Sequence, residues 1–140
     1  MKALLCFALL LAVCSATFYP SWERINPDQS ALWIDSVVAE SNAKAGQSNS
    51  LTVCGNANSD IQGIRSFYYE IGQGSDIWSN GNVDLTSTDV IKGRCYCFLY
   101  NYVVPHQVLD AYSVNLTLET PLSVVAGVQA NFKISTGFLF

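Results

Sequence analysis

Residues 112–119 alternate strictly between apolar and polar side chains. The apolar positions of this segment are Tyr112, Val114, Leu116 and Leu118. A period of two is typical of a β-strand with one buried face and one solvated face. Residues 125–135 repeat the pattern, and their inward positions are Val128, Ala130, Phe132 and Ile134. These two segments predict neighbouring strands that each contribute one face to a common core.

Residues 95–103 are apolar on both faces. One face carries the aromatic residues Tyr96, Phe98, Tyr100 and Tyr102, and the opposite face carries Cys95 and Cys97. Such a strand is either enclosed on both sides or lines something apolar that is not protein. The aromatic face is therefore interpreted as ordinary core packing or as the wall of a lipid site. The same two readings apply to the strand predicted at residues 64–71, where Phe67, Tyr69 and Ile71 share a face.

The remaining chain adds short strands and turns. Strands are expected at residues 32–40 and 50–54. Asn80-Gly81 is a tight-turn signal that is expected either to split residues 76–85 into two short strands or to interrupt one strand with a bulge. Residues 17–30 are expected to be irregular, and residues 87–94 to be a polar connection. No amphipathic helix is predicted after the first residues. The pattern predicts an all-β antiparallel sandwich of seven or eight strands.

The first sixteen residues have the features of a signal peptide. Lys2 precedes an apolar run over residues 3–13, and Cys14-Ser15-Ala16 offers small residues for cleavage. Residues 17–140 are then one domain, secreted or held in an endosomal or lysosomal lumen. Apolar residues form 50% of the chain and charged residues 13%, which excludes a disordered chain, and a net charge of -4 disfavours nucleic acid as a partner.

Candidate catalytic chemistry is absent from the sequence. His106 is the single histidine and follows Pro105 in a predicted turn, and no nucleophile motif, phosphate loop or metal-ligand spacing accompanies it. The chain is therefore expected not to be an enzyme and to have no catalytic residue, metal or cofactor.

Three of the five cysteines, Cys54, Cys95 and Cys97, follow the predicted signal peptide. A secretory route favours oxidation, so one disulfide and one spare thiol are expected. Cys54 is expected to pair with either Cys95 or Cys97, which are too far apart along one strand to bridge easily to each other. Separately, Asn115-Leu116-Thr117 is a glycosylation sequon whose asparagine lies on the polar face of its strand.

The order of these segments resembles a known family. The residues that carry the likeness are IDSVVAESNAKAGQSNSL at 34–51, the stretch from Gly93 through VVP to AYSVNLTLE at 93–119, and GVQANFKIS at 127–135. In this pattern residues 22–135 resemble the ML (MD-2-related lipid-recognition) domain, a family with sterol-binding and phospholipid-transfer members. The chain lacks the cysteines that the family usually has near the mature N-terminus and in the last strand, so the family's disulfide pattern is not carried over.

The resemblance implies an immunoglobulin-like sandwich that holds a phospholipid or sterol between its sheets, as a monomer with transient membrane contact. The expected lipid-binding residues are Phe67, Tyr69, Ile71, Tyr96, Phe98, Tyr100, Tyr112, Val114, Leu116, Phe132 and Ile134. The alternative is a secreted sandwich with a closed core that binds protein or glycan through its loops. A dry cavity between the sheets favours lipid, and a core closed to native density favours the interaction module.

Overall fold

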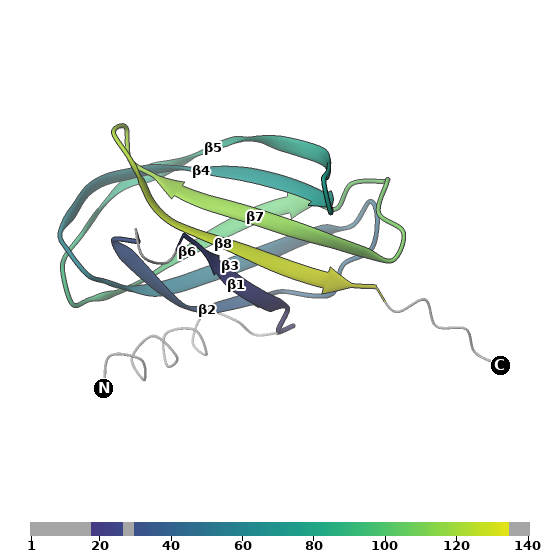
Figure 1. The fold of residues 1–140 in the computed structure, drawn as a ribbon, viewed down its shortest axis with the longest axis horizontal. Coiled ribbons are helices and arrows are strands. Elements are labelled where there is room, and N and C mark those ends of the chain that lie inside the picture. Colours follow the sequence, from purple (N-terminus) through teal and green to yellow (C-terminus); the bar gives the residue numbers. More distant parts are fainter. Residues whose placement is uncertain (1–17, 27–29, 135–140) are drawn as a thin grey trace.

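A computed structural model describes residues 18–26 and 30–134 of the chain, all of them in strands, turns and loops (Figure 1). The strands are β1 (Ser21–Ile25), β2 (Leu32–Ala39), β3 (Ser48–Ala57), β4 (Ile61–Gln73), β5 (Asp76–Val90), β6 (Cys95–Val103), β7 (Ala111–Glu119) and β8 (Val124–Lys133). The expected signal peptide at residues 1–16 lies outside the described residues.

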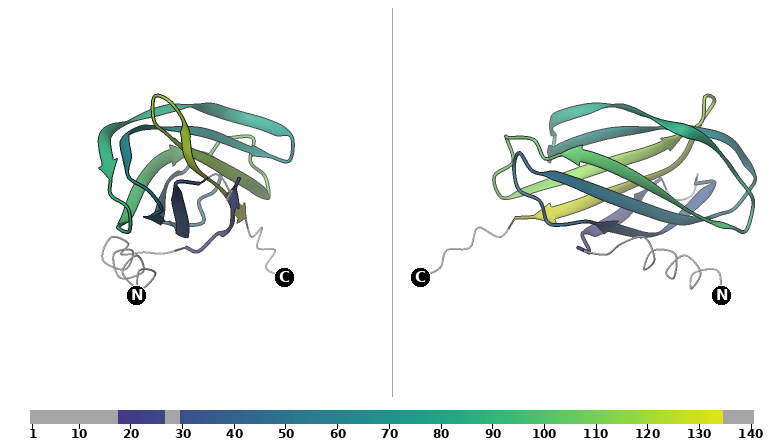
Figure 2. Two further views of the ribbon diagram at one scale, coloured as in Figure 1. Left: turned by 60° about the vertical axis from the view of Figure 1, so that its left-hand side comes forward. Right: turned by 180° about the vertical axis from the view of Figure 1, so that it is seen from behind.

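The strands form two antiparallel sheets that face each other (Figure 2). One sheet has five strands in the order β1-β8-β7-β4-β5, and the other has three in the order β2-β3-β6. If β2 to β8 are read as strands A to G of an immunoglobulin domain, A, B and E form one sheet and G, F and C form the other. Strand D of this comparison, which is β5, pairs with β4 instead of joining the sheet of β2 and β3. The all-β sandwich prediction is confirmed.

Strand register places the alternating residues as the sequence predicts. In β7, Val114 lies opposite Ile71 of β4 and Ala130 of β8, and Leu116 lies opposite Tyr69 and Val128. The apolar members of each strand therefore project together towards the three-stranded sheet, where they form one core with Leu51, Val53 and the other inward residues of that sheet. The polar members, including Asn115, lie on the outer face of the five-stranded sheet.

The disulfide joins Cys54 of β3 to Cys97 of β6. These residues are direct cross-strand partners in the β3–β6 register, and the bond lies on the face of the sheet that points away from the main core. The expected bond from Cys54 is confirmed, and Cys97 is its partner. The expectation of a spare thiol is wrong for Cys95, because Cys95 is itself disulfide-bonded.

Two local predictions are wrong. Residues 17–30 contain a strand, because β1 pairs with β8 over its whole length, from Ser21 opposite Asn131 to Ile25 opposite Gly127. Asn80-Gly81 forms no turn: β5 runs through it without a break, and these residues pair with Glu70 and Tyr69 of β4. The hairpin turn lies earlier, at Gly74-Ser75 between β4 and β5, where Gly74 has a φ of 60° that favours glycine.

Candidate functional site between the sheets

Aromatic side chains form a continuous series of ring contacts between the sheets. Phe132 stacks on Tyr112 with centroids 4.6 Å apart, and Tyr102 stacks on Tyr100 at 5.3 Å. The two pairs meet edge to face where Tyr102 approaches Tyr112. Tyr100 then contacts Tyr69 at 5.4 Å and Phe67 at 6.1 Å, and Phe67 meets Phe98 at 6.2 Å. Strands β4, β6, β7 and β8 thus contribute rings to one row across the core.

All of the side chains expected to line a lipid site belong to this one cluster. The buried members are Phe67, Ile71, Phe98, Tyr100, Tyr112, Val114, Leu116, Phe132 and Ile134. Tyr69 and Tyr96 are half-buried and pack against the cluster. Sequence periodicity therefore located a common surface, although burial alone does not distinguish a core from a ligand wall.

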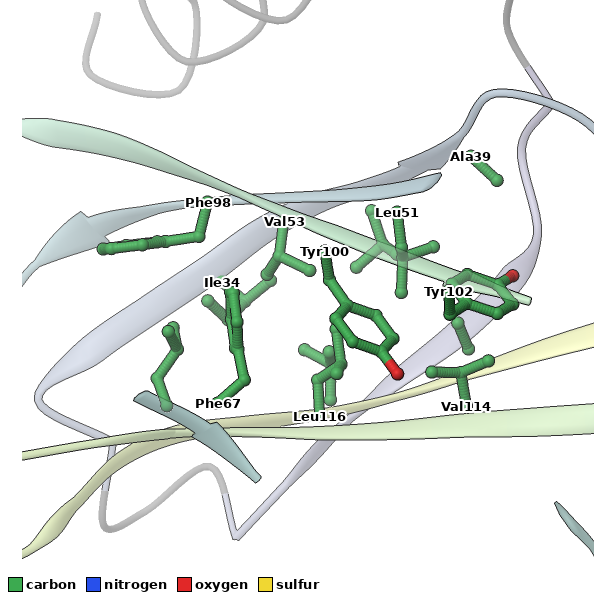
Figure 3. Packing of buried hydrophobic residues seen from close by; sticks show 14 of the residues in the cluster. Ile34, Ala39, Leu51, Val53, Phe67, Phe98, Tyr100, Tyr102, Val114 and Leu116 are labelled. Carbon is green, nitrogen blue, oxygen red and sulfur yellow. The ribbon is translucent and has the colours of Figure 1, made fainter. Parts of the chain in front are cut away.

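The space between the sheets is nearly closed. A narrow gap lies among Ile34, Val53, Phe67 and Leu116, and no part of it is wide enough to admit a water molecule. Figure 3 shows how closely side chains from the two layers approach one another around it. Such close packing is what a closed core requires. A lipid tail could enter between the sheets only if the sheets moved apart, because the gap has no room for it.

One end of the core contains a hydrogen-bonded polar cluster. The Asn49 amide nitrogen donates to the Tyr102 hydroxyl at 3.0 Å, and the Tyr102 and Tyr112 hydroxyls lie 3.3 Å apart. Tyr112 also donates to the Ala43 carbonyl at 3.4 Å, and the Asn49 side chain bonds the backbone of Ser41. Burial raises the pKa of Tyr102 and of Tyr112, which keeps both phenols protonated. The polar side chains of Asn49, Tyr102 and Tyr112 are therefore all hydrogen-bonded at this end.

Asn49 was missed by the sequence interpretation. It lies two positions before Leu51 and four before Val53, so the period of two already places it on the inward face of β3. The signal was present, but a polar residue in a short polar connection gave no reason to extend the strand. Residues 48 and 49 belong to β3 because they pair with Val103 and Tyr102 of β6.

Tyr100 lies in the middle of the row. Its side chain is 2% exposed, and its ring contacts those of Phe67, Tyr69 and Tyr102. Burial raises the pKa of Tyr100 far above the usual range of a phenol, and the neighbouring Tyr69 adds to the effect. In Figure 3 the ring extends from β6 into the space between the sheets.

The two long sides of the sandwich are built differently. On the side of β1 and β2, Arg24 donates from Nε to the Ile34 carbonyl at 2.7 Å, and its guanidinium lies over the rings of Trp33 and Trp22. The Ala31 amide also donates to the Val125 carbonyl at 2.9 Å. Hydrogen bonds therefore connect the five-stranded sheet to β2 or to the chain entering it.

On the opposite side, the amide of Ile91, the residue after β5, donates to the Tyr96 hydroxyl of β6 at 2.9 Å. Along the rest of this side, no hydrogen bond joins β5 to β6 within the part of the chain that the structure describes. Of the side chains of β5 that face inward, Val90 at the end of the strand is buried, and the others are only half-buried because the three-stranded sheet does not extend over them (Figure 2). The half-buried apolar side chains that pack along this margin are Tyr69, Trp78, Val83, Leu85 and Tyr96. We call this margin the β5–β6 edge.

Asn115 lies in the middle of β7, on the outer face. The oxygen of its side-chain amide, Oδ1, is buried without a hydrogen-bond partner. Beside it, Glu70, Ser113 and Gln129 line a depression of about 190 Å³. The sequon is thus part of a regular central strand, and glycosylation at Asn115 stays a prediction. No cluster of metal-ligating side chains occurs among residues 18–26 and 30–134.

Comparison with known proteins gives matches to the fold alone. No family model matches the chain, and no curated protein matches it. Among solved structures, the C-terminal domain of wzt is similar with a TM-score of 0.60 and 10% identity, over 89% of this chain and 84% of that one. Spo0M, a sporulation control protein from Bacillus subtilis, is similar with a TM-score of 0.52 and 12% identity, over 77% of this chain and 51% of that one. At these identities the likeness establishes a shared sandwich architecture.

Proposed function

We propose that this chain is a secreted or lumenal protein that binds the acyl or sterol part of a lipid between its two sheets. The observation that carries the proposal is the asymmetry of the long sides. Arg24 and Ala31 tie the sheets together on one side, whereas along the β5–β6 edge the described chain shows a bond only at one end, from the Ile91 amide to the Tyr96 hydroxyl. The sheets can therefore part at the β5–β6 edge while the opposite side acts as a hinge. The half-buried aromatic and aliphatic side chains of this edge are suited to the first contact with a lipid tail.

Burial of a lipid tail supplies a free-energy gain that opposes the cost of opening the core. Burial of about 14 methylenes contributes roughly 11 kcal/mol at about 0.8 kcal/mol each, before the costs of association and of parting the sheets. The side chains that separate would exchange contacts with one another for contacts with the lipid, so little apolar surface would become wet. No covalent chemistry is involved.

The disulfide supports the proposed location. A buried Cys54–Cys97 bond is compatible with an oxidising compartment, which is where a chain with a leader of this kind is delivered. The lipid would then be carried between membranes that face the lumen or the outside of the cell.

The direct test is to purify the folded chain and extract it with organic solvent for mass spectrometry. Stoichiometric lipid in the extract, and saturable uptake of a fluorescent acyl or sterol probe by the delipidated protein, are the expected results. The proposal would be overturned if the extract contained no lipid and the delipidated protein took up no probe.

A second candidate, a secreted interaction module, is favoured by the closed packing of the core. In that case the narrow gap among Ile34, Val53, Phe67 and Leu116 is a packing defect, and partners bind at the loops. One loop end has a surface hollow of about 390 Å³ lined by Arg65, Asp89 and Leu122 among others, and Leu122 is 95% exposed there. Binding of a protein or glycan that is lost on Arg65→Ala and Leu122→Ala substitution, with no lipid uptake, would favour this candidate.

A further inference from the structure

The outer face of the five-stranded sheet has a polar hollow of about 190 Å³ over β4, β7, β8 and the β4–β5 turn. Three of the residues that line it, Glu70, Asn115 and Gln129, lie opposite one another across β4, β7 and β8 in the strand register. These three strands lie side by side in the sheet (Figure 1). Because this face points away from the core, the hollow is independent of the proposed lipid site.

Asn115 places a buried acceptor at this hollow that has no donor in the described chain. Its neighbours in the same row are paired: Gln129 donates from Nε2 to Asn131 Oδ1 at 3.1 Å, and Tyr68 donates to Glu70 Oε1 at 2.9 Å. The Oδ1 of Asn115 is buried between these pairs and accepts no hydrogen bond from any described residue. A buried acceptor in this state costs free energy, so a ligand that brings a donor would be favoured.

The charges around the hollow select the chemistry of that ligand. Glu70 and Asp76 both line it, and the described lining residues include no lysine or arginine. A phosphate, sulfate or carboxylate would add negative charge beside these two side chains and would gain no cation in return. A neutral molecule with several hydroxyl groups supplies the donors that carboxylate and amide oxygens accept.

The size of the hollow restricts the ligand further. Its volume is below the range of about 300–1,000 Å³ that is typical of pockets for drug-sized molecules, so it suits one ring-sized group. Ile77 lines the hollow and is 50% exposed, which provides apolar surface for the C–H side of such a ring. The rest of a longer ligand would lie along the polar outer face of β7 and β8.

We infer that this face binds a neutral glycan, with one sugar residue in the hollow and a sugar hydroxyl donating to Asn115 Oδ1. The χ2 torsion of an asparagine is soft, so a small rotation of the amide brings the buried oxygen to the ligand. The Tyr68 hydroxyl holds Glu70 by Oε1, and Oε2 accepts from a second sugar hydroxyl. Since Asn115 also belongs to the predicted sequon, a glycan attached to it would compete for the same hollow.

The test therefore uses the chain produced in bacteria, where Asn115 carries no attached glycan. The folded protein is titrated with maltotriose, mannotriose and chitotriose up to millimolar concentrations, and backbone amide shifts are followed by NMR. We expect saturable binding of at least one of these sugars, with the largest shifts on β4 and β7 around Glu70 and Asn115. Binding of none of the three would overturn the inference.

Matched variants locate the site on the sheet. Asn115→Val should weaken binding of the sugar about tenfold, because the acceptor is lost. Asn82→Val, at an exposed position of β5 on the same face but outside the hollow, should change affinity less than about twofold. Thr117→Val removes the sequon but keeps Asn115, and it should bind as wild type does. Equal affinity of Asn115→Val and wild type would overturn the inference.

The urea midpoint of each variant separates loss of binding from loss of fold. Asn115→Val should keep or raise the midpoint, because it removes an unsatisfied acceptor and places a β-branched residue in a strand. Glu70→Gln, which keeps the size of the side chain, is the second variant and should weaken sugar binding at least threefold. Unchanged affinity of Glu70→Gln would also count against the site, and none of these outcomes bears on the proposed lipid function.

Discussion

Arg24 of β1 donates a hydrogen bond from its Nε to the backbone carbonyl of Ile34 in β2, at 2.7 Å, and so links the two sheets. The guanidinium carbon also lies 4.0 Å from the centroid of the Trp33 ring, which adds a cation–π contact. Both contacts use the planar shape of the guanidinium, which gives the link a defined geometry.

The substitution Arg24→Lys should therefore destabilise the protein. A lysine keeps the charge but loses the planar stacking and the Nε donor, so we expect a loss of about 1–2 kcal/mol in the free energy of unfolding. Urea denaturation followed by tryptophan fluorescence measures it. Arg65→Lys at an exposed position is the matched control and should change stability by less than about 0.5 kcal/mol. Equal effects at the two positions would contradict a special role for Arg24.

Gly81→Leu should hinder lipid uptake at the β5–β6 edge. An added side chain at Gly81 points towards the Tyr69 ring, where the contact is already close, so it would occupy the space through which a ligand passes. Asn82→Leu adds an apolar side chain at the next position, which is exposed and lies on the opposite face of β5. We expect Gly81→Leu alone to slow uptake of a fluorescent lipid by about tenfold or more. Similar rates for the two variants would argue against a route across this edge.

Removal of the disulfide should lower stability substantially. Cys54 and Cys97 are 43 residues apart, so the loss of loop closure in the unfolded chain corresponds to about 4 kcal/mol. The double substitution Cys54→Ala/Cys97→Ala is compared with wild type by urea denaturation without reductant. An unchanged midpoint would show that the bond contributes no stability in this fold.

Phe67→Ala tests the aromatic row as part of the core. Phe67 is completely buried and contacts rings from β6, so we expect a loss of about 3–5 kcal/mol from the lost burial and the cavity left behind. The control is Leu122→Ala, at a side chain that is 95% exposed, which should have little effect. A loss below about 1 kcal/mol for Phe67→Ala would mean that the core collapses around the missing ring or is already loosely packed.

Stability should decline at high pH because of the buried tyrosines. Burial raises the pKa of Tyr100, Tyr102 and Tyr112 in the folded state, so the unfolded chain releases these protons at a lower pH than the folded protein does. Their contribution is complete below the unfolded pKa of 10.0 and is lost as the pH rises above it, by up to about 1.4 kcal/mol per pH unit for each tyrosine.

The matching measurement is a series of urea midpoints between pH 8 and 11, together with tyrosinate absorbance. The expected result is a falling midpoint above about pH 10 and a group of tyrosines that ionise only on unfolding. Ionisation of every tyrosine near pH 10 with the fold intact would contradict their burial.

Much of the fold follows from local patterns. The alternation in residues 112–119 and 125–135 was sufficient to assign β7 and β8 and to identify which side chains of each point inward, because side-chain direction in a strand depends only on parity. Local pattern was misleading at Asn80-Gly81, where pairing of β5 with β4 outweighs the turn preference of the dipeptide. It also failed at β1, whose polar and aromatic residues form a strand only because β8 offers an edge to pair with.

The sequence by itself determined the aromatic face of β6, the cysteine face opposite it and the sandwich class, since all three depend on the period of two. Only the tertiary structure decided that Cys97 is the partner of Cys54, because that choice depends on the register of β3 against β6. It also decided the hydrogen-bond partners of the Tyr102 hydroxyl, which are Asn49 of β3 and Tyr112 of β7. The reason is physical: a hydroxyl is satisfied by whatever lies opposite it, and strands far apart in the chain provide that neighbour.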